Sequence, residues 1–137
     1  MTIKNTENGT TMRARLSKSI VLAIRRLMQQ ERPDAESLDM AAFVVLALEL
    51  MATSVDSAAQ AWEKRDYWLK ADHFRQDWAW LNQSQQALKT AVLSQDWQAI
   101  ARELIVVGQH LQDVQLSPNH RLGTPWNGAW EQLQKSL

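Results

Sequence analysis

Residues 38–62 read LDMAAFVVLALELMATSVDSAAQAW, and this stretch decides the fold. Apolar side chains recur in it at spacings of three and four residues, the period of one face of an α-helix: Leu38, Ala41, Val45, Leu48, Ala52, Val55, Ala59 and Trp62. A second apolar stripe, made of Phe43, Leu46 and Leu50, predicts that this helix is buried on more than one side. We therefore expect a long central helix with the other elements packed around it.

The rest of the chain also has helical periodicity. Apolar stripes predict helices over residues 12–31, 67–93 and 96–114, and a short amphipathic helix over residues 125–137. No glycine or proline marks the boundary between the second and third helices, so a break at 53–57 or at 64–66 is open. The later break is preferred because the first stripe stops at Trp62. The sequence predicts an all-α fold, an antiparallel four-helix bundle with a short C-terminal amphipathic helix packed on it.

Length and composition indicate one domain. A chain of 137 residues is large enough for a single core, and its four glycines and three prolines lie mostly near the ends. Residues 1–11 are polar and lack the apolar segment of a signal peptide, so we expect a disordered N-terminal arm followed by one domain over residues 12–137. The apolar run Met40–Ala52 is shorter than the ~20 residues that cross a bilayer. With no cysteine in the chain, we expect a cytoplasmic protein with no membrane segment.

Charge is segregated although the net charge is zero. Residues 1–32 carry seven basic and two acidic side chains, whereas residues 33–63 carry six acidic side chains and no basic ones. In a helical hairpin, Glu49 lies within reach of Arg15 or Lys18, which predicts an ion pair across the seam with one of the two. A second interpretation is a basic stripe on the first helix, formed by Lys18, Arg25 and Arg32, that meets phosphate or an acidic partner. With balanced charge overall and no recognition motif, nucleic acid is an unlikely partner.

The motifs that carry chemistry are missing from the sequence. It has no glycine-rich phosphate loop, no Gly-x-Ser-x-Gly nucleophile turn and no His-Glu-x-x-His zinc motif. His73, His110 and His120 each lack a glutamate three residues before them, so the Glu-x-x-His pattern of di-iron bundles does not occur. We expect no catalytic residue, no metal and no cofactor.

The candidate functional surface is the aromatic and charged run over residues 62–80, which holds four of the seven tryptophans. Several of its large side chains fall off the core face of the predicted third helix, where they need either a cover or a binding partner. Trp and Arg are also enriched among the residues that dominate binding at interfaces. The candidate surface comprises Trp62, Arg65, Asp66, Trp68, Lys70, Asp72, His73, Arg75 and Trp80.

Two functions follow from this surface. The first is a non-enzymatic protein that acts through protein–protein contacts, including self-association as a homodimer. The second is a bundle that binds a small ligand or RNA through the Trp/Arg/His cluster. The C-terminal helix is expected to fold back over the flank that carries His73 and Trp80, because its stripe of Trp126, Trp130, Leu133 and Leu137 needs an apolar partner.

Overall fold

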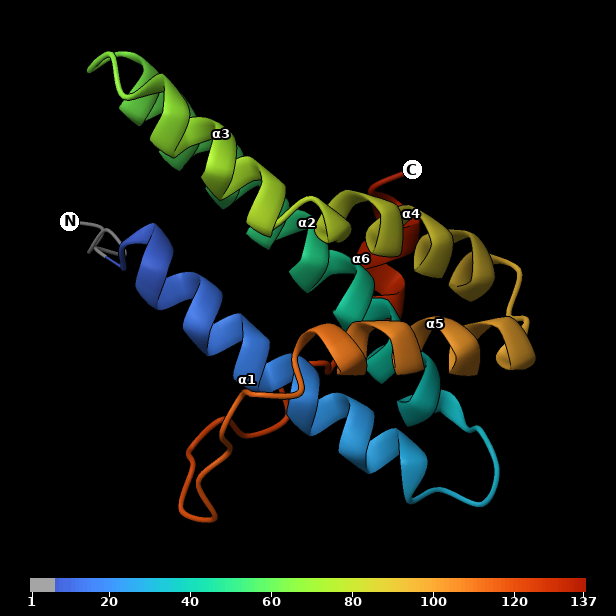
Figure 1. Cartoon of the computed structure of the whole chain (residues 1–137). Helices are drawn as coiled ribbons and strands as arrows, with labels where there is room; N and C mark the ends of the chain where they lie inside the picture. Colours follow the sequence, from blue (N-terminus) through green and yellow to red (C-terminus); the bar gives the residue numbers. More distant parts are fainter. Residues whose placement is uncertain (1–6) are drawn as a thin grey trace, which may run out of the picture.

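The computed structural model describes residues 7–137, and within them every regular element is a helix (Figure 1). The all-α prediction is confirmed. The six helices of this part of the chain are α1 (Gly9–Met28), α2 (Ala35–Glu63), α3 (Trp68–Asp77), α4 (Trp80–Leu93), α5 (Trp97–His110) and α6 (Ala129–Lys135).

Helix α2 is the central element, as its sequence predicts. It contacts α1, α3, α4 and α6, and its buried side chains include Met40, Val44, Leu48 and Met51. Asp34 and Ser37 close a capping box at its start: the Asp34 carboxylate accepts from the Ser37 N–H at 2.8 Å, and the Ser37 hydroxyl accepts from the Asp34 N–H at 3.0 Å.

By length and composition alone, α2 is also apolar enough to cross a membrane, and half of its apolar window is buried inside the molecule. The helix spans 29 residues and so extends well beyond the apolar run Met40–Ala52.

The second apolar stripe of α2, made of Phe43, Leu46 and Leu50, is only partly buried, since Leu50 is 53% exposed.

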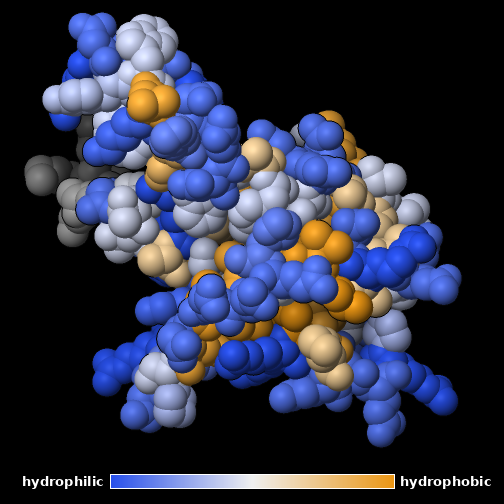
Figure 2. All heavy atoms as spheres, viewed as in Figure 1, coloured by the Kyte–Doolittle hydropathy of each residue, from blue (hydrophilic) through white to orange (hydrophobic). Residues whose placement is uncertain are grey.

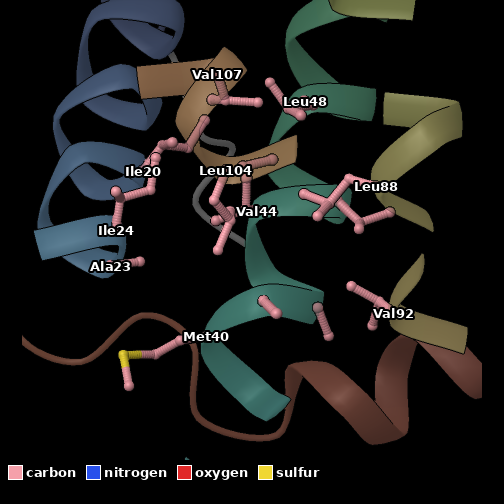
Figure 3. Close-up of a cluster of buried hydrophobic side chains, with 14 of the residues drawn as sticks. Ile20, Ala23, Ile24, Met40, Val44, Leu48, Leu88, Val92, Leu104 and Val107 are labelled. Atoms are coloured by element: carbon pink, nitrogen blue, oxygen red, sulfur yellow. The ribbon is translucent and has the colours of Figure 1, made fainter. Parts of the chain in front are cut away.

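The core lies where four helices meet. Side chains of α1, α2, α4 and α5 converge there, with Ile20, Leu48, Leu88 and Val107 as examples (Figure 3). Successive contacts join α1 to α2, α2 to α4, and α4 to α5, while α1 and α5 meet over a smaller region. The helix predicted over residues 96–114 is α5, which ends at His110, and its buried face contributes Ile100, Leu104 and Val107 to the core.

The third helix is divided, which the sequence does not predict. The segment expected as one helix over residues 67–93 forms α3 and α4, with a turn at Trp78 and Ala79. Both helices pack on α2, but α3 lies along its C-terminal half and projects with it beyond α4 and α5 (Figure 1). The α2–α3 connection lies at residues 64–67, so the preferred later break is confirmed.

Helix α1 begins earlier than Met12. The Asn8 side chain accepts a hydrogen bond from the Thr11 N–H at 2.8 Å and caps the helix, so residues 9–11 are helical rather than part of a disordered arm. The remainder of the expected arm, residues 1–6, lies outside the described residues.

The C-terminal segment folds back onto α2, and the prediction that it covers Trp80 is wrong. Trp126 comes before α6 rather than within it, and its indole is fully buried. The Asp39 carboxylate on α2 accepts from the Trp130 N–H at 2.9 Å and from the Gly128 N–H at 3.4 Å, which anchors the start of α6. Trp80 instead stacks on the imidazole of His110, with ring centroids 4.4 Å apart.

The predicted ion pair between Glu49 and α1 is also wrong. Within the described residues, no ion pair joins Glu49 to Arg15 or Lys18, and the Arg15 guanidinium instead binds Glu7 at 2.8 Å. The acids of α2 reach α3 and α6 rather than α1, and Lys18 and Arg25 of α1 remain exposed.

Candidate functional site

A hollow of about 630 Å³ lies at the end of the α2–α3 hairpin, and we call it the hairpin-tip hollow. The turn beneath it ends α2 in a Schellman motif: Asp66 takes a left-handed conformation (φ 62°), and the Tyr67 N–H donates to the Trp62 carbonyl at 2.9 Å. The chain therefore reverses within four residues and places the start of α3 beside the end of α2. The hollow is lined by Trp62, Asp66, Tyr67, Trp68, Leu69, Lys70, His73, Phe74 and Asp77.

Three consecutive large side chains on this hollow are exposed. Tyr67 is 56% exposed, Trp68 61% and Leu69 70%. They lie on the part of the hairpin that projects beyond the body of the molecule, where no other described element covers them (Figure 1). An apolar cluster of this kind marks a contact surface more often than a scattered exposed residue does.

The inner wall of the hollow is held by contacts between its own side chains. The rings of Trp62 and Phe74 meet edge to face, with centroids 4.8 Å apart, and the Lys70 ammonium lies 4.7 Å above the Trp62 ring. These contacts fix the orientation of Trp62 at the end of α2. A preformed wall lowers the entropy that a partner's binding costs.

Five of the nine predicted surface residues line the hollow, namely Trp62, Asp66, Trp68, Lys70 and His73. The other four do not. Arg65 is exposed in the turn, Asp72 accepts a hydrogen bond from Gln76, and Trp80 lies beyond the α3–α4 turn. Arg75 makes a two-pronged ion pair with Glu63, at 2.9 Å for both contacts, and a longer contact with Asp56 at 3.4 Å.

The pair of Glu63 and Arg75 is electrostatically tight. Hydrogen bonds from Arg75 hold the pKa of the Glu63 carboxyl below its usual value, and the same bonds raise the pKa of Arg75. The guanidinium is already engaged with two carboxylates of its own chain. The Trp/Arg/His cluster expected from the sequence is therefore divided between two places.

Below the hollow, a row of stacked rings and cations joins α3 to α1 and α5. The Arg13 guanidinium lies 5.0 Å from the Phe74 ring centroid and 5.9 Å from that of Trp78. Trp78 stacks on Trp80, with centroids 6.4 Å apart, and Trp80 stacks on His110. This row holds α1 against the hairpin, so the position of the hairpin-tip hollow depends on it.

A second concave site was not found from the sequence. An apolar groove of about 510 Å³ lies between the second half of α1 and α5, and we call it the α1–α5 groove. A helical stripe on α5, made of Trp97, Ala101, Ile105 and Gly108 beside the core stripe, is the signal from which it could have been found. The other lining residues are Ile24, Leu27, Met28, Gln30, Pro33, Ser37, Ile100, Leu104, Gln109 and Gln112.

Catalytic geometry does not assemble in either site. In residues 7–137, no cluster of three or more His, Asp or Glu side chains is arranged to hold a metal ion. The imidazole of His73 and the carboxylates of Asp66 and Asp77 share the hairpin-tip hollow, but within that same range no hydrogen bond orients one toward another. The arrangement favours binding over acid–base or nucleophilic chemistry.

The chain matches no protein-family model, no curated protein and no solved structure.

Proposed function

We propose that this chain is a non-enzymatic cytoplasmic protein that acts through protein–protein contacts, and that the hairpin-tip hollow is its binding surface. The observation that carries the proposal is the exposure of Tyr67, Trp68 and Leu69 at the projecting end of the α2–α3 hairpin. Trp and Tyr are the residue types that most often dominate binding energy at interfaces. Burying Trp68 and Leu69 against a partner removes two large apolar side chains from water, which is worth roughly 1.5–3 kcal/mol for each.

The lining of the hollow indicates what the partner presents. Trp62 and Phe74 form an apolar inner wall, while Lys70, Asp66 and Asp77 put charges of both signs around it. Such a surface suits a protein partner that inserts an apolar side chain and meets the rim with polar groups. A second copy of this chain is one such partner, which makes a homodimer part of the proposal.

The scaffold that we propose for this function is an antiparallel four-helix bundle with a C-terminal helix packed on it. In support, neighbouring contacts run from α1 to α2, from α2 to α4, from α4 to α5 and back to α1, and α6 packs on α2. Helix α3, packed on α2, extends the bundle. It lifts the binding surface away from the core that stabilises it.

The second candidate, a small ligand or RNA held by the Trp/Arg/His cluster, has less support. Arg75 is engaged by Glu63 and Asp56, and Trp80 by His110, so neither is free to bind a base or a phosphate. Lys64, Arg65 and Lys70 are exposed near the hollow, but Asp66, Asp72 and Asp77 offset them. A polyanion therefore meets no concentrated positive field at the hairpin tip.

Site-specific photo-crosslinking tests the proposal. A photoreactive phenylalanine replaces Trp68 in one variant and Leu50 in a matched control, because Leu50 is an exposed apolar residue of α2 outside the hollow. We expect a protein adduct of defined mass in cells from position 68 and none from position 50. An adduct of twice the mass of the chain identifies the homodimer.

Competition shows whether an adduct is specific. Added wild-type protein should suppress the adduct at position 68, whereas a Trp68→Ser/Leu69→Ser competitor with an unchanged circular dichroism spectrum should not. Equal suppression by both competitors, or an adduct that ribonuclease removes, contradicts a protein-binding hairpin tip.

A further inference from the structure

The α1–α5 groove reaches the core of the protein. Ile24, Ile100 and Leu104, which form its floor, are at most 8% exposed, while Met28 and Ile105 on its edges are 76% and 55% exposed. Figure 2 shows hydrophobic side chains gathered over α5 and the neighbouring part of α1. The groove is therefore a depression in the bundle rather than a flat patch. Its volume of about 510 Å³ lies within the range of sites that hold small organic molecules.

The lining of the groove carries no charged side chain. Its polar members are Ser37 and three glutamines. Ser37 and Gln30 are hydrogen-bonded to each other, but the side-chain amides of Gln109 and Gln112 have no protein partner among residues 7–137. A charged ligand here would lose its hydration without gaining an ion pair, whereas a neutral one would not. The two free amides can donate to, or accept from, a neutral polar group at one end of the ligand.

Gly108 lines the groove and has open space beside its backbone. It lies inside α5, where glycine is unfavourable because it has the most backbone freedom to lose. A Cβ built at this position meets no atom within 4 Å, so the backbone would tolerate a side chain there. Open space above a helical glycine, on a floor of buried core residues, provides the cross-section that a flat aromatic or aliphatic ligand needs.

We infer that the α1–α5 groove binds a small, uncharged and largely apolar molecule whose alcohol, carbonyl or amide group is held by Gln109 and Gln112. This site shares no lining residue with the hairpin-tip hollow, and the inference does not depend on the proposed protein contacts. Three observations support this ligand class: the floor of the groove is buried, its lining is uncharged, and open space lies beside Gly108.

Two fluorescent dyes with the same aromatic frame test the inference. N-phenyl-1-naphthylamine is uncharged, and 1-anilinonaphthalene-8-sulfonate adds a sulfonate. We expect the uncharged dye to bind the full-length protein with saturable one-to-one stoichiometry, and the sulfonate to bind about tenfold more weakly because nothing in the groove pairs with its charge. Equal affinity for the two dyes, or no saturable binding of the uncharged one, overturns the inference.

Gly108→Leu fills the groove, and Gly108→Ala is the matched control that adds only a methyl group. We expect the leucine variant to bind the uncharged dye about tenfold more weakly, and the alanine variant to stay within about threefold of wild type. Ala101→Leu, on the same face of α5, is the second filling variant should Gly108→Leu fail to fold. Unchanged dye binding in a folded filling variant overturns the inference. A dimer in light scattering that the leucine variant converts to a monomer also overturns it, because the groove would then hold a second copy.

Discussion

Arg13 is a buried cation, only 7% exposed, with no carboxylate partner in the described part of the chain. Its guanidinium stacks against Phe74 and Trp78 and donates to the hydroxyls of Ser54 and Thr10. Burial lowers the pKa of Arg13, as expected where water is withdrawn from a charged group. A planar, weakly hydrated guanidinium suits this position because it stacks on rings and donates in its plane.

Arg13→Lys should therefore be more damaging than its charge conservation implies. We expect a loss of about 2 kcal/mol in the free energy of unfolding, because a strongly hydrated ammonium cannot stack on both rings and stay hydrated. Arg13→Met keeps the packing, removes the buried charge and should cost less. Urea unfolding of the two variants measures the difference. A lysine variant as stable as wild type would show that the guanidinium geometry is unimportant.

Gln95 has a left-handed backbone conformation that strains a residue with a Cβ but would not strain glycine. It closes a Schellman motif at the end of α4 with φ 52°, and the following Asp96 N–H donates to the Ala91 carbonyl at 3.0 Å. Gln95→Gly should raise the free energy of unfolding by about 0.5–1 kcal/mol, because the left-handed conformation costs a residue with a Cβ. Gln95→Ala keeps the Cβ and should give no gain. Equal stability of the two variants in thermal melts would contradict this account.

The candidate residues could be predicted only where local geometry determines their positions. Trp62, Asp66, Lys70 and His73 gather because they flank one turn between two helices, and short separation in sequence brings them together. The α1–α5 groove was missed because its two walls are far apart along the chain, and the stripe of α5 that lines it does not show which element lies opposite. Gly108 inside an apolar helix was the available sign.

At the scale of elements, the apolar period predicted which segments are helical but not where α3 ends. The stripe continues through Trp78 and Leu81 as if one helix ran on, with no proline or glycine to interrupt it. The turn at Trp78 and Ala79 lets α3 and α4 pack on different parts of α2. Period alone carries no information on such a change of direction, because both helices keep an apolar face toward the same partner.

The docking of α6 depends on one carboxylate of α2. Asp39 accepts from the N–H groups of Gly128 and Trp130, as a capping residue would, although it lies far away in sequence. Asp39→Ala should lower the free energy of unfolding by about 1–2 kcal/mol, which is the range for loss of a helix N-cap. Asp39→Asn keeps an acceptor oxygen and should retain most of the stability.

Glu49→Ala is the control for Asp39, since it removes an exposed carboxylate of the same helix that forms no ion pair in residues 7–137. Thermal unfolding and the fluorescence of buried Trp126 report the result. If Asp39→Ala and Glu49→Ala melt alike, with Trp126 still protected from a quencher, then α6 docks by apolar packing alone.

At the scale of the whole molecule, the segregated charges do not pair α1 with α2 as the sequence predicts. The acids of α2 hold α3 through Arg75 and α6 through its first N–H groups, and α1 keeps Lys18 and Arg25 exposed. Helix α1 packs on α2 through apolar residues instead. Lys18 and Arg25 therefore lie on a solvated face of α1, where unpaired cations have the lowest free energy, whereas Arg32, the third member of the predicted stripe, lies beyond the end of α1 at Met28.

This arrangement predicts how stability depends on pH. The pKa of Glu63 is lowered chiefly by hydrogen bonds from Arg75, and the pKa of Asp34 is lowered chiefly by hydrogen bonds from Ser37. A carboxyl with a lower pKa in the folded state than in the unfolded state binds fewer protons when folded. Its contribution to stability is complete above its ordinary value of about 4, and is lost as the pH falls through the lower folded value.

The urea midpoint should consequently fall as the pH is lowered from 5 toward 3. Glu63→Gln and Asp34→Asn should each flatten that slope, because asparagine still caps α2 but does not titrate. Arg75→Met leaves the Glu63 carboxyl in place and removes its partner, so it should flatten the slope as Glu63→Gln does. If the slope stays at its wild-type value in Glu63→Gln and Arg75→Met alike, the pair between α2 and α3 does not contribute to acid lability, and the source must be sought in other carboxylates.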